Sequence, residues 1–199
     1  MSRIIGCEHL HIAPIKKDDL TGSEWGDLVP VPSLISIDIT DQRDDVTFYS
    51  DNVIEQVIPA FSGKEVTIEL GYLTNELEAL ISGNTYKNGV LSQSVSNTST
   101  EFAMMWRAPK SKGGFSYLCL YKGVLARTES NFKTKEDSIE SSTVSLTGVF
   151  MPLVSNGLVA IKADSDDKTP SALINTWFTE VPVQTQGGSA ESRINTKKK

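Results

Sequence analysis

The sequence predicts one β-rich domain with two short helices. Apolar and polar residues alternate with a period of two in several segments, which is typical of half-buried strands. Gly, Asn and Asp separate these segments, as expected at turns, and only two segments show helical spacing. Hydrophobic residues make up 39% of the 199 residues, enough for one sizeable core. We expect a folded domain over residues 1–181 and a flexible tail or arm over residues 182–199, where Gln, Gly, Ser and Lys dominate.

The first elements are expected to be two strands separated by a loop. Residues 2–15 alternate in places and predict the first strand. Residues 18–26 are polar and contain two glycines, which favours a loop. Residues 29–40 end in a clean alternation that predicts a half-buried strand with one isoleucine face, made of Ile35, Ile37 and Ile39.

An apolar hairpin is predicted after an acidic turn over residues 41–45. Two apolar segments, residues 46–49 and 53–58, flank a Ser-Asp-Asn sequence. Asp and Asn favour turns because their side chains hydrogen-bond to nearby backbone groups. We therefore expect residues 46–58 to form a projecting β-hairpin.

The stretch GKEVTIELGYLTNELEALISG, residues 63–83, predicts a strand that leads into a helix of about two turns. Thr74 can accept a hydrogen bond from the first helical amides, and Gly83 suits the left-handed backbone that ends many helices. So short a helix is not stable alone in water. It is expected to pack through its apolar face, made of Leu77, Leu80 and Ile81.

The second half of the chain predicts a long connection followed by further strands. Residues 84–100 are rich in Ser, Thr and Asn, with a turn signal at Asn88–Gly89, and connections of this length are often functional. Alternating apolar and aromatic residues over 102–121 predict a long hairpin. Residues 143–150 and 158–163 predict two more strands.

A short helix is expected to begin at Thr169 and Pro170. Pro fits the first helical position because its missing amide would have no partner there. The apolar residues that follow recur at helical spacing, and Trp177 ends this stripe. We expect Trp177 to pack the helix.

Composition argues against several classes of function. The net charge is −6 and the basic run at residues 197–199 is confined to the end of the chain, whereas binding to DNA phosphates requires a basic patch. No apolar run approaches the roughly 18 residues of a membrane helix. The first residues lack a signal-peptide pattern, so we expect synthesis and folding in the cytosol and no membrane partner.

The sequence supports no catalytic or cofactor site, and we expect a protein that is not an enzyme. Cys7, His9 and His11 could share one face of the first strand, but a structural zinc site needs about four ligands and no second cluster supplies them. The acidic run at residues 164–167 departs from the EF-hand pattern. Cys7 and Cys119 are expected to be reduced, buried thiols.

From residue 5 to about residue 181, the chain resembles the major tail (tail tube) protein family of long-tailed phages that infect Gram-positive bacteria. The order and spacing of seven stretches carry this resemblance, and the last of them contains the Trp-Phe pair Trp177–Phe178. They are IIGCEHLHIAPIKKDD, VPSLISIDI, VTFYSDN, GKEVTIELGYLTNELEALISGNTYKNGV, FKTKED, STVSLTGVF and TPSALINTWFTEV.

The resemblance implies a β-sandwich or barrel-like subunit with one flanking α-helix. Subunits of this family assemble into hexameric rings, and the rings stack into a hollow tube that conducts the genome toward the host. The chain would then be a structural protein of the virion tail, assembled in the host cytoplasm. Its partners would be itself, the tape measure protein in the lumen, and the tail terminator and distal tail proteins, while DNA passes without specific binding.

Other functions remain open. A tail-completion or baseplate protein of the same fold would form a single ring, and a soluble β-sandwich binding module would remain a monomer. A small hydrolase with a sandwich fold would need convergent carboxylates with raised pKa values, for which the sequence gives no sign. A contractile-tail or secretion-system tube is related in architecture and differs by its accompanying sheath.

A subunit of a tube would need two kinds of surface. Some sheet edges and loops must contact defined neighbours, and we expect these contacts in the hairpin and in the 84–100 connection, at Val46, Phe48, Tyr49, Val53, Ile54, Val57, Asn88, Val90 and Leu91. Acidic groups in the channel would keep DNA from adhering to the wall, and the candidates are Asp38, Asp41, Asp44 and Asp45. Helix packing is assigned to Leu77, Leu80, Ile81 and Trp177.

Overall fold

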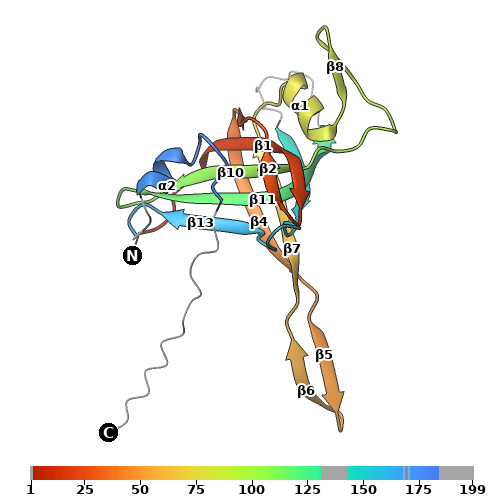
Figure 1. The fold of residues 1–199 in the computed structure, drawn as a ribbon, viewed down its shortest axis with the longest axis vertical. Helices are drawn as coiled ribbons and strands as arrows, with labels where there is room; N and C mark the ends of the chain where they lie inside the picture. The colour runs from red at the N-terminus through yellow and green to blue at the C-terminus, as the bar shows by residue number, and fades with distance from the viewer. Residues whose placement is uncertain (1, 131–142, 168, 170, 184–199) are drawn as a thin grey trace, which may run out of the picture.

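The body of the protein is one large antiparallel sheet (Figure 1). The computed structural model describes residues 2–130, 143–167, 169 and 171–183. The predicted mainly β fold with two short helices is confirmed. In spatial order the strands are β2 (Gly22–Trp25), β1 (Glu8–Asp19), β10 (Phe102–Pro109), β11 (Phe115–Ser130), β12 (Val144–Phe150), β7 (Phe61–Leu70) and β4 (Leu34–Arg43), with β13 (Ala160–Asp164) paired to β11 and β3 (Val29–Pro30) paired to β1.

Two small hairpins stand outside this sheet. One consists of β5 (Val46–Ser50) and β6 (Val53–Ile58), and the other of β8 (Thr85–Lys87) and β9 (Val90–Ser92). The first agrees with the hairpin predicted over residues 46–58. Of the tail predicted over residues 182–199, only residues 182 and 183 belong to the described part of the chain.

One continuous segment of chain closes the sheet toward a barrel. Its first part, β3, pairs with β1, and its second part, β4, pairs with β7 at the far end of the strand order. Between the two parts, the Val31 amide donates to the Leu10 carbonyl at 2.8 Å, and the Gly71 amide donates to the Ser33 carbonyl at 2.8 Å. Ser33 has a φ of 60°, so the chain turns there. The same piece of backbone therefore links β1 to β7, while β2 and most of β4 remain as edge strands.

Two hydrophobic cores bury the central strands on both faces. Because successive strand residues point to opposite faces, Met104 joins the inner core and its neighbour Met105 joins the outer core. The outer core is covered by β13 and by the segment that contains α2 (Ser171–Thr176), and Trp177 is fully buried in it. Burial on both sides explains why the run from Phe102 to Trp106 is entirely apolar.

Helix α1 (Asn75–Ser82) lies over one end of the inner core. The Thr74 hydroxyl accepts a hydrogen bond from the Leu77 amide at 3.2 Å, and Gly83 has a left-handed φ of 67°. A side chain at Gly83 would collide with the Thr98 carbonyl, so glycine is required there on two counts. Both helix ends agree with those predicted from the sequence.

The prediction of a loop over residues 18–26 is wrong. Strand β1 continues to Asp19, and β2 begins at Gly22 and pairs with it. The turn forms around Asp19, whose carboxylate accepts hydrogen bonds from the hydroxyl and the amide of Thr21 at 2.5 and 2.7 Å. These two bonds lower the pKa of Asp19 to about 2. This segment is polar because it forms a partly exposed strand at the edge of the sheet, not because it is a loop.

The predicted isoleucine face is interrupted. A bulge beside Leu34 shifts the pairing of β4 with β7, so that Leu34 and Ile37 pack against the inner core while Ile35 remains 51% exposed. Strand β1 also differs from its predicted bounds. It begins at Glu8 rather than at residue 2, and its pairing is irregular around His9, whose φ is 56°.

A buried ion pair joins three segments that are distant in sequence. The Asp18 carboxylate accepts hydrogen bonds from the Lys122 ammonium at 2.9 Å, the Ser23 hydroxyl at 2.8 Å and the Val154 amide at 3.1 Å, and its side chain is only 3% exposed. Burial by itself raises the pKa of Asp18. The hydrogen bonds, chiefly that from Lys122, outweigh burial and hold the pKa below its ordinary value of 3.8.

Replacing Asp18 with alanine should lower the free energy of unfolding by roughly 2–4 kcal/mol, because it leaves the Lys122 ammonium without its nearest partner. Denaturation by urea at pH 7 measures this loss. The exposed Asp27 provides a matched control, and Asp27→Ala should stay within about 0.5 kcal/mol of the wild type.

The same pair predicts a dependence on pH. Because folding lowers the pKa of Asp18, its contribution to stability is complete above pH 3.8 and is lost as the pH falls through the lowered value. The difference between wild type and Asp18→Ala should therefore shrink in acid. Equal stability of the two proteins at pH 7 would contradict the assignment.

Candidate assembly surface

The β5–β6 hairpin extends away from the body of the molecule (Figure 1). It prolongs the β4–β7 ladder, and the Asp44 amide donates to the Ala60 carbonyl at 2.8 Å where the two ladders meet. Beyond this point, among the described residues, β5 and β6 pair only with each other. Asp51 and Asn52 have φ values of 48° and 64°, as in the tight hairpin turns that match the twist of paired strands.

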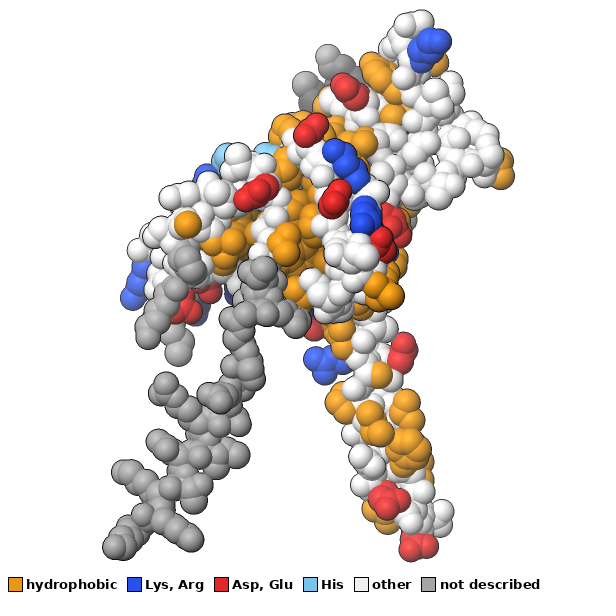
Figure 2. Space-filling view, viewed as in Figure 1, with side chains coloured by type: hydrophobic (Ala, Val, Ile, Leu, Met, Phe, Trp, Pro, Cys, Tyr) orange, Lys and Arg blue, Asp and Glu red, His pale blue; other side chains and the backbone are white. Residues whose placement is uncertain are grey.

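Apolar side chains cover this hairpin and are open to solvent. Figure 2 shows hydrophobic side chains along its length. The six predicted contact residues of the hairpin are each between 48% and 69% exposed. An isolated two-stranded hairpin has little stability of its own in water, and exposed apolar patches mark interaction sites. The six residues are Val46, Phe48, Tyr49, Val53, Ile54 and Val57.

The hairpin is apolar on both of its faces. Val46 lies opposite Ile58, and Tyr49 lies opposite Ile54. Because successive strand residues point to opposite faces, Val46 and Phe48 share one face while Tyr49 lies on the other. A flat surface could bury one of these faces only. A partner that buries both must offer two walls.

The predicted acidic residues follow the same path from the sheet to the hairpin. Asp38 and Asp41 are exposed on β4, and Asp44 and Asp45 connect β4 to β5. Asp41 forms an ion pair with Lys64 of β7, and the hydrogen bond from Lys64 lowers the pKa of Asp41. The other three carboxylates form no ion pair within the described part of the chain.

The second predicted contact region contains a hairpin of its own. Strands β8 and β9 meet at Asn88 and Gly89, which have φ values of 53° and 82°. Val90 is exposed and Leu91 is half-buried. This hairpin lies beside α1, at the opposite end of the molecule from β5 and β6 (Figure 1). The structure thus divides the predicted contact residues between two distant surfaces.

The residues assigned to helix packing also separate into two groups. Leu77 and Ile81 of α1 are buried in the inner core, and Leu80 is half-buried against it. Trp177 lies in the outer core, just after α2 rather than within it, with its amide bonded to the Ile174 carbonyl. These four residues therefore stabilise the fold in two places and do not form one site.

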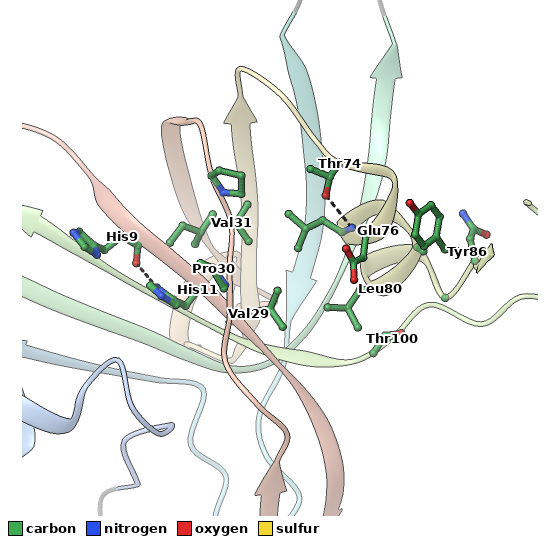
Figure 3. A pocket seen from close by; sticks show the side chains of 16 residues that line it. His9, His11, Val29, Pro30, Val31, Thr74, Glu76, Leu80, Tyr86 and Thr100 are labelled. Carbon is green, nitrogen blue, oxygen red and sulfur yellow. Dashed lines mark hydrogen bonds between the residues drawn. The ribbon is translucent and has the colours of Figure 1, made fainter. Parts of the chain in front are cut away.

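Beside α1 the surface is hollowed into an open groove of about 1040 Å³ (Figure 3). Helix α1 forms one wall, and β1 with β3 forms the other. Its floor includes Leu10, Val31 and Leu77, which belong to the inner core. No pattern in the sequence indicated this groove, because its two walls are roughly 45 to 70 positions apart in the chain.

The groove rim carries the two histidines considered above as metal ligands. His11 Nδ1 donates a hydrogen bond to the His9 carbonyl at 3.0 Å, and both rings contact Phe178. Burial raises the pKa values of the Cys7 and Cys119 thiols, which favours their protonated form. Within the described ranges no group of three or more His, Cys, Asp and Glu residues is placed to hold a metal ion.

The helices that the structure describes include none long and apolar enough to span a membrane. Both are short, and α1 buries Leu77, Glu78, Ala79 and Ile81. The surfaces that remain as candidates for function are therefore the two hairpins and the groove.

Removing the β5–β6 hairpin should leave the barrel stable. If residues 46–58 are replaced by an Asn-Gly turn, we expect the free energy of unfolding to change by less than about 1 kcal/mol, because the hairpin contributes no strand pairing to the sheet and a shorter loop costs less entropy to close. Urea denaturation with circular dichroism measures this. A much larger loss would show that the hairpin belongs to the fold itself.

Comparisons with known proteins provide no identification. Neither a protein-family model nor a curated protein matches the chain. The function has to be inferred from the surfaces described above, together with the resemblance of the seven sequence stretches.

Proposed function

We propose that this chain is a structural protein that assembles with copies of itself into rings, and that the rings stack into the hollow tail tube of a phage. The observation that carries the proposal is the β5–β6 hairpin, which is exposed, apolar on both faces and unpaired with the rest of the described sheet. The family resemblance supplies the form of the assembly, with six subunits in a ring.

The energetics of the hairpin favour a role in association. Apolar surface removed from water contributes about 25 cal/mol per Å², and the exposed apolar side chains of β6 gain only part of this within the single chain. Folding nevertheless orders these residues at an entropic cost. Burial of the hairpin against another copy would remove its remaining apolar surface from water. Association would therefore stabilise the ordered hairpin.

The open edge of the sheet supports lateral contacts within a ring. Strand β4 pairs with β7 on one side, and among the described residues its other side has no strand along Ser36–Arg43. Unpaired backbone groups of such an edge bond to strands of neighbouring molecules. Exposed charged groups, including Asp38 and Asp41, make indiscriminate pairing less favourable. This combination suits contacts with defined neighbours.

The charge of the chain agrees with passage of DNA rather than binding. The net charge is −6, and Asp38, Asp41, Asp44 and Asp45 lie along one stretch between sheet and hairpin. Placed toward the channel, they would repel phosphates over about 8 Å at physiological salt. The tape measure, terminator and distal tail proteins are the further partners that this proposal implies, and the tail of the virion is the implied location.

Purified protein should form long hollow tubes of uniform width as its concentration is raised. Electron microscopy and light scattering on the same samples measure this. Closed single rings would favour the tail-completion or baseplate alternative. A monomer at every concentration, and absence of the chain from virion tails, would overturn the proposal.

The β8–β9 hairpin should also contribute to assembly. Val90→Asp places a charge on its exposed apolar surface, so tube formation should require at least about tenfold more protein, which corresponds to about 1.4 kcal/mol per contact. The matched control is Leu20→Asp, which adds the same charge at a more exposed position in the β1–β2 turn. Tubes of Val90→Asp that form at the wild-type concentration would exclude this surface.

A further inference from the structure

The groove beside α1 and the β5–β6 hairpin lie at opposite ends of the long axis of the molecule (Figure 1). The groove floor is apolar, because Leu10, Val31 and Leu77 of the inner core reach it. Figure 3 shows Leu80 and Val29 on facing walls, with Glu76 and Tyr86 on the helix side and His9 and Pro30 on the strand side. Most of the groove surface is thus able to bury apolar side chains.

We propose that this groove receives the β5–β6 hairpin of a second copy of the chain. The inference rests on the proposed function and adds to it the receiving site of the hairpin. A hairpin cannot reach the groove of its own chain, since the two lie at opposite ends of the molecule. The contact therefore joins the end of one copy to the opposite end of the next.

The two faces of the hairpin match the two walls of the groove. Near the turn, Tyr49 and its cross-strand partner Ile54 share one face while Val53 lies on the other, so that complete burial requires a wall on each side. The groove offers α1 on one side and β1 with β3 on the other. No flat surface of the sheet offers this arrangement, which is why the groove is favoured as the receptor.

The lengths of the two elements limit the contact to the outer part of the hairpin. Helix α1 has eight residues and is about 12 Å long. Strand β5 has five residues and spans about 17 Å. The side chains near the turn, Tyr49, Val53 and Ile54, are the ones that enter the groove, and the residues nearer the body remain outside it.

Charge defines the orientation of the inserted hairpin. Between residues 44 and 63 the charged side chains are all acidic, and Asp51 and Glu55 lie near the turn. The exposed imidazole of His9 can donate a hydrogen bond to either carboxylate, whereas the Glu76 carboxylate on the opposite wall repels them. The hairpin therefore enters with these two carboxylates nearer to β1 than to the helix.

A contact of this kind can join one copy after another into a chain of subunits. Each copy carries one hairpin and one groove, and the surfaces differ, so the interface is heterologous and does not close between two copies. In the proposed tube it would join successive rings along the axis. The open edge of β4 would remain available for contacts within a ring.

The test mixes two variants that are each defective at one surface. The hairpin variant is Tyr49→Asp with Ile54→Asp, and the groove variants are Leu80→Glu and, separately, Pro30→Glu. Pro30 is exposed, so its variant provides a groove change that does not disturb the core. All the new charges are negative, so a variant hairpin and a variant groove repel each other and cannot form a new ion pair. Leu20→Asp is the control for an added charge.

Each variant alone should form no tubes, whereas Leu20→Asp assembles like the wild type. An equimolar mixture of the hairpin variant with either groove variant contains one intact hairpin and one intact groove. It should form a complex of twice the mass of the species that each variant forms alone, and no tubes. Light scattering after size-exclusion chromatography measures the mass.

Two results would overturn the assignment of the groove. If wild type and both groove variants form tubes at the same concentration, the groove is not the receptor and the tube function stands. If the mixture forms no complex although the wild type assembles, the hairpin binds elsewhere. A wild-type protein that never assembles overturns the proposed function, and the absence of a complex in the mixture then overturns the groove as well.

Discussion

The pairing of one continuous segment with two different strands is the constraint on which the rest of the structure depends. Residues 29–43 hold β1 through β3 and hold β7 through β4. This closure bends the sheet around the inner core and leaves α1 over one end of it. At the other end, β4 and β7 run on into the β5–β6 hairpin. The groove and the hairpin thus lie at opposite ends because the same backbone ladder determines both positions.

Among the described residues, the apolar side chains gather mainly in three places. The inner core fills the barrel, and the outer core joins β10 and β11 to the segment around Trp177. A third group lies on the β5–β6 hairpin and is open to water. The first two groups account for the stability of the single folded chain. The third leaves about half or more of its apolar surface in water, which is the reason that we propose association as the function.

Local signals in the sequence predicted much of the fold. The turn at Asp51–Asn52, the caps at Thr74 and Gly83 and the alternation in β7 depend on residues within a few positions of each other, and all of them are present. The polar segment over 18–26 was misinterpreted, because a polar composition does not distinguish an edge strand from a loop. Ile35 was misplaced because a bulge changes the face on which later residues lie.

By itself, then, the sequence determined the mainly β class, the capped helix and the position of the apolar hairpin, since each arises from short-range backbone preference and periodicity. Only the tertiary structure decided that one segment links β1 to β7, that Asp18 pairs with Lys122 across 104 positions, and that α1 and β3 form a groove. These features arise from contacts between residues distant in the chain. Such contacts depend on how the strands are ordered in space, and no local pattern records that order.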